Sequence, residues 1–419
     1  MDALYRGHVA AFRRDEVPRR RFPALDPEPP PPPWWKRLLW PACVLAAAAL
    51  VVTAVRLLPP LFTRPPAASR SPAAAGPGHR PAGPAVRAAG RVVFVTPSGS
   101  LALANPDGSH LARAGGLGNV GDAVAASPDD RYISLLNGQV IRISPGPALA
   151  SFPGKVQLSS NTTVALPDPF ADHGQAVVML QDCGDPTYSS TNPISVISIA
   201  TGRSVALGSG DQVAGDPAAD GVFTTVTASL TTGAVSLETS PDATVVLRDA
   251  GRRPVPLATA SELTGDLGLS RRLAVSLAVY PSPSGAEAAV TVRPAAGGPG
   301  GGMGILTRSG RAVARLPARA GGGPALGAPV WSPSGKSLAY LSTSSGGAPQ
   351  LSVWSAGRRP LVSSQLPASA GRYGECVWAP DSTSVLCPAA GGSEWVITPA
   401  AGGKPAVAAG PGLPVAWLR

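Results

Sequence analysis

The stretch that decides the fold runs from Ala328 to Pro360 and reads APVWSPSGKSLAYLSTSSGGAPQLSVWSAGRRP. An aromatic-Ser-Pro turn is followed by an apolar run, a Gly-rich turn, a second apolar run and another Gly turn. The same order returns between Glu375 and Pro405, as ECVWAPDSTSVLCPAAGGSEWVITPAAGGKP. Each copy divides into short β-forming segments bounded by Gly and Pro. The repeated unit is therefore a small antiparallel sheet of four strands.

Weaker copies of the unit precede these two. One begins at Ala123 with AVAASPDDRYISLL and another at Leu277 with LAVYPSPSGAEAAV, and two divergent copies lie between them, containing AVVMLQDC and VAGDPAADGVFTTVTA. Four short strands per ~40–50 residues are typical of the blades of a β-propeller. A blade has two apolar faces that it can bury only against its neighbours, so we expect the copies to form a ring.

The ends of the repeat region indicate how the ring closes. The segment from Gly90, GRVVFVTPSGSLALANPDGSHLARAG, supplies three strands and lacks an innermost one. The segment Leu413–Arg419, LPVAWLR, looks like an isolated innermost strand with its aromatic residue. We expect this segment to complete the first blade, which removes two exposed sheet edges. The sequence predicts an all-β propeller of about seven blades over residues 91–419, with six or eight as alternatives.

The best copies resemble the WD40-like (PD40) repeat of TolB-type propellers. The resemblance is good in the last two copies and faint from Lys155 to about Thr264. The residues that carry it are Ser127, Pro128, Asp129, Ser282, Pro283, Gly285, Trp331, Ser332, Pro333, Gly335, Trp378, Pro380, Asp381 and Trp417. These are turn and packing residues, so the resemblance implies a fold and no catalytic residue. The layout is also distantly similar to the propeller of actinobacterial LpqB lipoproteins, although this sequence lacks their lipobox and their additional domain.

Composition excludes some classes of protein. The chain has 419 residues, and its 49 Gly and 48 Pro accompany 44% hydrophobic and only 14% charged residues. This composition indicates many turns between short strands rather than disorder. Abundant Ala, Pro, Gly and Arg with little Lys suggests an actinobacterial source. The net charge of +10 comes from scattered arginines, clustered only between Arg13 and Arg21. No basic face with interleaved aromatics is present, so we expect no nucleic-acid partner.

A membrane anchor is predicted near the N-terminus. Leu38–Val55, LLWPACVLAAAALVVTAV, contains no charge and spans ~27 Å as a helix. Tryptophans and most nearby positive charges precede it, which places the N-terminus in the cytoplasm. A cleaved signal peptide is disfavoured because RLLPPLFTRPP follows directly, and lipidation of Cys43 because the apolar run follows that cysteine. The expected parts are a basic, Pro-rich cytoplasmic tail (1–37), a signal anchor (38–55), a Pro/Ala-rich linker (56–90) and an extracytoplasmic propeller (91–419).

The cysteines allow one disulfide. If the last blade's first hairpin turns around Pro380 to Thr383, Cys376 lies opposite Cys387, close enough for a bridge. Two buried thiols are the alternative. Cys183 has no evident partner and is either free or paired with another chain.

The search for catalytic or metal-binding groups is largely negative. No G-x-S-x-G motif is present, and GLGNVG (Gly116–Gly121) is followed by no predicted Rossmann helix. Four scattered histidines, His8, His79, His110 and His173, make no metal centre. Four aspartates in the third copy could hold Ca²⁺ or simply lie in solvated loops: Asp168, Asp172, Asp182 and Asp185. Solvated loops are the preferred interpretation, and no cofactor is predicted.

The resulting hypothesis is a non-catalytic binding or scaffold module tethered at the cell envelope, with a protein, peptide or glycan as partner. The alternatives are a propeller enzyme of the lyase, glycosidase or quinoprotein type, and a sensor that signals through the short tail. The innermost strands carry mostly small, apolar or aromatic residues, which favours binding. Two carboxylates or a His cluster facing each other in the central channel would favour an enzyme.

Overall fold

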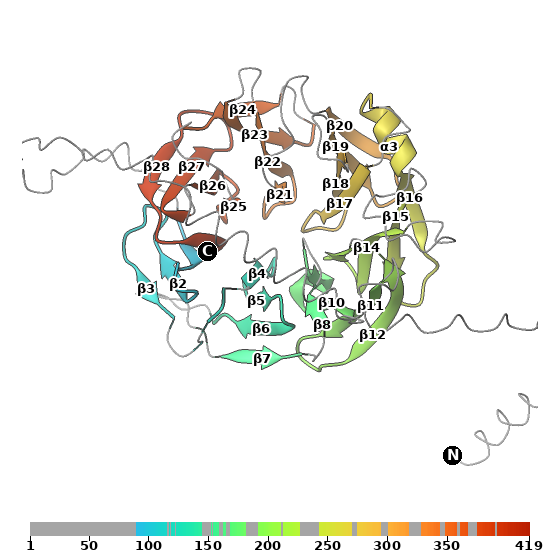
Figure 1. The fold of residues 1–419 in the computed structure, drawn as a ribbon, viewed down its shortest axis with the longest axis horizontal. Coiled ribbons are helices and arrows are strands. Elements are labelled where there is room, and N and C mark those ends of the chain that lie inside the picture. Colours follow the sequence, from blue (N-terminus) through green and yellow to red (C-terminus); the bar gives the residue numbers. More distant parts are fainter. Residues whose placement is uncertain are drawn as a thin grey trace, which may run out of the picture. The chain divides into compact units, whose positions relative to one another are not determined.

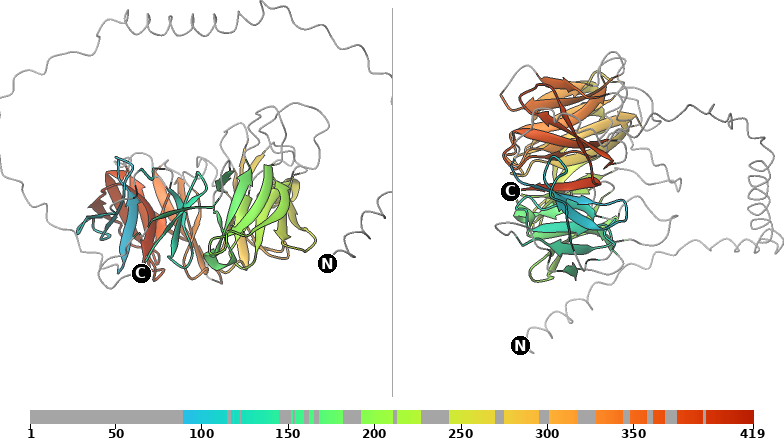
Figure 2. Two further views of the ribbon diagram at one scale, coloured as in Figure 1. Left: turned by 90° about the horizontal axis from the view of Figure 1, so that it is seen from below. Right: turned by 90° about the vertical axis from the view of Figure 1, so that its left-hand side faces the viewer.

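The computed structural model describes residues 89–419 apart from these positions: 115–116, 118, 122, 145–151, 153, 159–161, 165–167, 182–191, 211–212, 227–242, 270–274, 295–300, 318–327, 344–347, 358–360, 368–374 and 390–391. Within this part the chain forms seven small antiparallel sheets arranged as the blades of a ring (Figure 1). Figure 2 shows the ring from the side, with neighbouring blades standing next to one another. The prediction of a seven-bladed all-β propeller is confirmed.

Apart from β29, the strands of the first four blades follow the chain in order. Blade 1 contains β29 (Leu413–Leu418), β1 (Arg91–Val95), β2 (Leu101–Ala104) and β3 (Ala112–Arg113), from the centre outward. Blade 2 contains β4 (Ala123–Ala126), β5 (Tyr132–Leu135), β6 (Gln139–Arg142) and β7 (Lys155–Gln157). Blade 3 contains β8 (Thr162–Val164), β9 (Phe170–Ala171), the 3-10 turn η1 (Asp172–Gly174), β10 (Ala176–Gln181), β11 (Asn192–Ser198) and β12 (Ser204–Gly210). Blade 4 contains β13 (Val213–Asp216), β14 (Gly221–Val226), β15 (Thr244–Asp249) and β16 (Val255–Thr259).

The helix α3 (Ala260–Asp266) leads from blade 4 to blade 5. Blade 5 contains β17 (Val275–Pro281), β18 (Glu287–Pro294), β19 (Gly302–Thr307) and β20 (Ala312–Pro317). Blade 6 contains β21 (Val330–Trp331), β22 (Ser337–Thr343), β23 (Pro349–Ser355) and β24 (Val362–Gln365). Blade 7 contains β25 (Val377–Trp378), β26 (Ser384–Ala389), β27 (Glu394–Pro399) and β28 (Ala406–Ala409).

The ring closes as the sequence predicted. Strand β29 pairs antiparallel with β1, and Trp417 stands opposite Val92. The indole Nε1 of Trp417 also donates a hydrogen bond to the carbonyl oxygen of Ala89, 3.1 Å away. Blade 1 is therefore assembled from both ends of the propeller. Strand β29 covers the inner edge of β1, which would otherwise be unpaired.

The hydrophobic core is divided among the blade interfaces. The buried apolar residues form seven clusters, one between each pair of neighbouring blades. Between blades 7 and 1, for example, the rings of Phe94 and Trp395 meet edge to face at 5.5 Å. Because each blade buries both faces in this way, apolar residues stand on both sides of its strands and the simple inside–outside alternation of a half-exposed sheet is lost.

The Ser-Pro turn of the repeat has a physical explanation in blade 6. Ser332 is fully buried, and its Oγ accepts a hydrogen bond from the N–H of Ser337 at 3.1 Å. The N–H of Gly335 donates to the Ser332 carbonyl at 2.8 Å, with Gly335 at φ +67°. Ser127 and Ser282 make the corresponding Oγ contacts in blades 2 and 5. The motif thus closes the innermost hairpin of a blade with its own side chain.

The helix α3 was not predicted. Thr259 and Glu262 form a reciprocal capping box at its start, in which each side chain accepts from the other residue's backbone N–H. Leu263 on its buried face joins the core between blades 4 and 5. The helix therefore connects two blades and also fills their interface.

No helix within the described part of the chain is both long and apolar enough to cross a membrane. The predicted anchor (38–55), the tail before it and nearly all of the linker lie outside the described residues.

Candidate binding cavity at the centre of the ring

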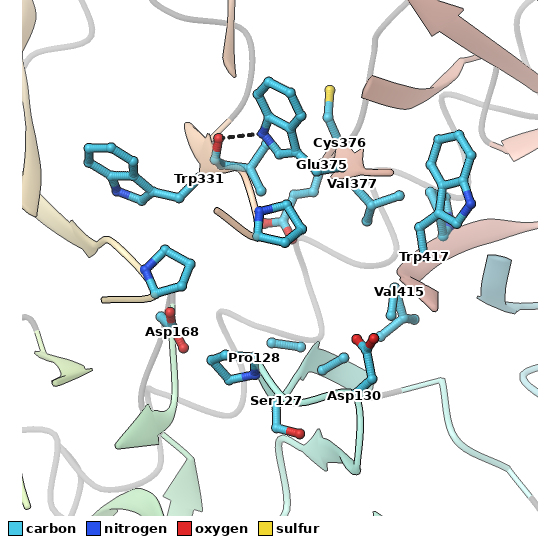
Figure 3. Close-up of a pocket in the computed structure, with 18 of the residues that line it drawn as sticks. Ser127, Pro128, Asp130, Asp168, Trp331, Glu375, Cys376, Val377, Val415 and Trp417 are labelled. Atoms are coloured by element: carbon cyan, nitrogen blue, oxygen red, sulfur yellow. Dashed lines mark hydrogen bonds between the residues drawn. The ribbon is translucent and has the colours of Figure 1, made fainter. Parts of the chain in front are cut away.

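A cavity of about 250 Å³ lies where the innermost strands converge (Figure 3). Residues from six of the seven blades line it, on an innermost strand, just before it or in the turn that follows. The wall is built largely from the repeat motif itself. Of the predicted motif residues, these line the cavity: Ser127, Pro128, Pro283, Trp331, Pro333, Trp378, Pro380 and Trp417.

Three tryptophans form much of the apolar wall, and the donor groups of all three are already engaged. Nε1 of Trp331 donates to the carbonyl of Tyr280, and Nε1 of Trp378 donates to the carbonyl of Val330, both at 2.8 Å. Each of these bonds joins an innermost strand to that of the preceding blade. Nε1 of Trp417 bonds to Ala89 as described above. The indole N–H groups are therefore not free for a ligand, and the rings themselves are buried in the cores between blades.

Prolines make the rest of the wall poor in hydrogen-bond donors. Seven line the cavity: Pro128, Pro281, Pro283, Pro329, Pro333, Pro380 and Pro414. Proline has no backbone N–H, so these positions present only carbonyl oxygens and hydrocarbon. These seven positions therefore offer a ligand acceptors and no backbone donor.

Three carboxyl groups face the cavity, on Asp130, Asp168 and Glu375. Burial raises the pKa of Asp168 to about 6, opposed by the N–H of Phe170, which donates to Asp168 Oδ1 at 3.2 Å. Burial also raises the pKa of Asp130 to about 6, although the backbone N–H and then the positive charge of Arg419 act in the other direction. Burial raises the pKa of Glu375 as well.

The carboxyls lie at two ends of the cavity. Asp168 and Glu375 precede the innermost strands β9 and β25, whereas Asp130 and Arg419 follow β4 and β29. Innermost strands related by rotation about the ring run in one direction, so Asp130 and Arg419 share one mouth and the other two acids the opposite one. Figure 3 shows Asp168 and Asp130 on different blades around the cavity. Three acids and one arginine thus line the cavity of a chain whose net charge is +10.

Tyr280 lies close to the Glu375 end. Burial raises the pKa of its phenol; the charge of Arg293 lowers it and that of Glu375 raises it again. The phenol is the only tyrosine among the cavity-lining residues in the described part of the chain. It gives this end of the cavity a polar group beside the acids.

A disulfide joins Cys376 to Cys387. Trp378 pairs with Val385 and Val377 with Leu386, which is the register that places the two cysteines opposite each other. Strand β25 has only two residues, so the bond adds a covalent link between β26 and the part of the cavity wall that begins at Glu375. Cys183 lies outside the described residues.

The structure corrects the interpretation of Asp168, which is partly buried at the cavity rather than solvated in a loop. Asp172 lies in η1 with φ +45°, and Asp182 and Asp185 lie outside the described residues. The expectation of small, apolar or aromatic inner residues fits most of the wall but missed the three carboxyls. Within the described ranges, no three His, Cys, Asp or Glu side chains are close enough to hold a metal ion.

The remaining candidates take structural places. His110 and His173 are exposed and stand apart from the cavity. In the GLGNVG segment, Leu117 and Val120 belong to the core between blades 1 and 2, and strand β4 follows at Ala123. This segment is a connection between blades.

No protein-family model matches the chain, and no curated protein matches it either. Several solved structures resemble it at low identity. Hydrazine synthase from Kuenenia stuttgartiensis is 13% identical with a TM-score of 0.43, over 68% of this chain and 79% of that one. A functionally unknown protein from Desulfotomaculum acetoxidans is 10% identical with a TM-score of 0.43, over 77% and 100%. An oligogalacturonate lyase from Vibrio parahaemolyticus is 10% identical with a TM-score of 0.44, over 76% and 90%.

Proposed function

We propose that this protein is a non-catalytic binding module tethered to the outside of a cell membrane, and that the central cavity holds its ligand. The observation that carries the proposal is the cavity, which six blades build together from strands and closed turns. The Trp331 and Trp378 indoles lock neighbouring innermost strands to each other. A site on such a scaffold is preorganised, so a ligand loses little affinity to ordering of the wall.

The tether and the location are supported by the sequence and by the disulfide. The segment 38–55 has the length and flanks of a signal anchor. The Cys376–Cys387 bond fits an oxidising exterior, where such bonds persist. An extended linker rich in Pro and Ala between anchor and propeller gives the module reach across the envelope.

A second candidate function, a propeller enzyme, is favoured by one observation. Asp130 and Asp168 face the same cavity, and burial raises the pKa of each to about 6. Carboxyls that titrate near neutral pH can act as general acid or base. The experiment below therefore includes a test for turnover.

The proposal predicts a ligand that depends on the cavity. The full chain in a nonionic detergent is screened by ligand-observed NMR against small sugars, carboxylic acids, amines and short peptides. We expect at least one class of compound to bind the wild-type protein. Val415→Trp, which fills the cavity, should abolish this binding, and Leu413→Trp should leave it unchanged. Leu413 lies on the same strand and is exposed. The bound compound should be recovered unchanged after long incubation.

Three results would contradict the proposal. Conversion of the bound compound would make the protein an enzyme. Binding unaffected by Val415→Trp would place the ligand elsewhere. In a third experiment, protease is added to intact and to lysed cells. If it cuts the propeller only in the lysed cells, the module lies inside the cell.

A further inference from the structure

We propose that the ligand of the central cavity is an organic cation, a primary ammonium group on a slender alkyl chain, with its charge between Asp168 and Glu375. This inference rests on the proposed function and names the chemistry of the same site. Three independent properties of the wall support it: its charge, its hydrogen-bonding groups and its size.

The charge of the wall selects a cation. Of the charged groups that line the cavity, Asp130 and Arg419 share one mouth, where the Arg419 N–H also donates to the Asp130 carboxylate. Asp168 and Glu375 stand at the other end, and Tyr280 is the titratable group that joins them there. No arginine or lysine lines that end in the described residues; Arg293, whose charge acts on Tyr280, is not among the lining residues. An anion would be repelled there, while an ammonium group would replace the countercharge that the wall does not supply.

The hydrogen-bonding groups select a donor. The seven prolines of the wall have no N–H, and the three indole N–H groups are bonded to backbone carbonyls. The Phe170 N–H is likewise bonded, to Asp168 itself. An ammonium group has three N–H donors and no acceptor, so it complements such a wall. The acceptors of a carboxylic acid would find no donor on these prolines or indoles.

The size of the cavity selects a slender ligand. Pockets for drug-sized molecules have volumes of roughly 300–1,000 Å³, and this cavity has about 250 Å³. A chain of a few methylene groups fits this space against the proline surfaces.

The test is isothermal titration of the full chain in a nonionic detergent at pH 7.5 and low salt. The probes are 1,5-diaminopentane and N-acetyl-lysine amide, with 1,5-pentanediol and glutarate as the neutral and anionic controls. We expect an amine to bind at least tenfold more tightly than either control. A preference for the free diamine would identify a small metabolite, and a preference for the lysine derivative would identify a peptide side chain.

The variants locate the charge. Asp168→Asn and Glu375→Gln should each weaken amine binding at least tenfold, and Asp168→Glu, which keeps the charge, should restore part of it. The matched control is Glu287→Gln on β18, a residue that does not line the cavity and should leave binding unchanged. Near-ultraviolet circular dichroism of every variant confirms that the fold is retained.

The outcomes separate this inference from the proposed function. Binding of the diol or of glutarate as tightly as the amines would overturn the cationic ligand and leave the cavity as a binding site. Amine binding that survives both neutralising variants would also overturn it. If no class of compound depends on the cavity, both proposals fail together.

Discussion

Two aspartates in neighbouring blades, Asp216 and Asp168, are each followed by proline but have different partners. Asp216 in blade 4 is fully buried and forms an ion pair with Arg308 of blade 5, whose Nη2 also lies 3.5 Å from an oxygen of Asp249. Asp168 in blade 3 is partly buried and accepts a backbone N–H from Phe170, with no charged side chain among the causes that shift its pKa. Burial raises the pKa of both carboxyls.

The difference separates a structural acid from a candidate ligand-binding acid. Asp216 takes the place that Ser332 has in blade 6, and its Oδ1 accepts the Ala218 N–H at 3.0 Å within the turn. Its charge is neutralised inside the protein by the next blade, so folding alone accounts for it. Asp168 lines a cavity, and no cationic side chain is among the causes that shift its pKa. This contrast is the physical basis of the cationic ligand proposed above.

The largest expected effect comes from removing the partner of Asp216. Arg308→Met should reduce the free energy of unfolding by about 3–5 kcal/mol, because it leaves an unpaired carboxylate in the interface between blades 4 and 5. Urea denaturation of the full chain at pH 7.5 measures the change.

The double variant Asp216→Ser/Arg308→Met is the control, since serine restores the residue of the repeat and removes the buried charge. It should recover most of the lost stability. A loss below about 1 kcal/mol in the single variant would show that the pair is effectively solvated, and the contrast with Asp168 would disappear.

A smaller change in the free energy of unfolding, a gain in stability, is expected for Asp168→Asn. Its pKa is about 6 in the folded protein against 3.8 for the ordinary group. The folded state therefore holds the proton more tightly, and stability falls as pH rises from about 4 to 6. Asp168→Asn removes this penalty and should stabilise the ligand-free protein by about 2 kcal/mol above pH 7, with no gain below pH 4.

Denaturation curves at pH 4 and pH 7.5 check this prediction. Asp130, Glu375, Arg419 and Tyr280 also line the cavity, but they are present in both proteins, so the difference between variant and wild type isolates Asp168. Asp381→Asn, in a turn of blade 7, should change stability by less than about 0.5 kcal/mol at both pH values. A pH-independent gain at residue 168 would mean that the carboxyl is not held in a raised-pKa state.

The smallest change in stability is expected in blade 6, where the turn has the uncharged Ser332 in the place of Asp216. Ser332→Ala should cost about 1 kcal/mol, because the N–H of Ser337 loses its acceptor in a partly buried turn. In blade 7 the same position is Ala379, and Ala379→Ser should be close to neutral. Thermal unfolding of both variants measures this, and equal effects in the two blades would refute the role assigned to the Ser-Pro turn.

The sequence predicted the features that depend on neighbouring residues. Turn motifs, short apolar segments and the lone Trp417 strand are local patterns, and they yielded seven blades and the closure of blade 1. Two local signals were overlooked. Thr259 and Glu262 have the spacing of a capping box, and Phe170 precedes Gly174 by the same interval as Trp331 precedes Gly335.

The candidate site could not be predicted in the same way. Asp168, Glu375 and Asp130 come from blades 3, 7 and 2, and nothing within any one repeat shows that they share a cavity. Their positions follow from rotation about the ring, which depends on the number of blades and on the register of each innermost strand. The countercharge of Asp216 by Arg308 is equally non-local, since 92 residues separate the two.

The pairing of β29 with β1 has a consequence for how the molecule is made. The bond from Trp417 to Ala89 connects residues 328 positions apart, so this contact is among the most distant in sequence that the ring contains. Contacts between residues so far apart in sequence form slowly, because the entropy cost of closing a long loop comes before the contact can stabilise the chain. Until the last strand arrives, β1 offers a bare edge to any β29 nearby, including that of another copy. Crowding of newly made chains should therefore favour exchanged dimers, in which each molecule completes its neighbour's first blade.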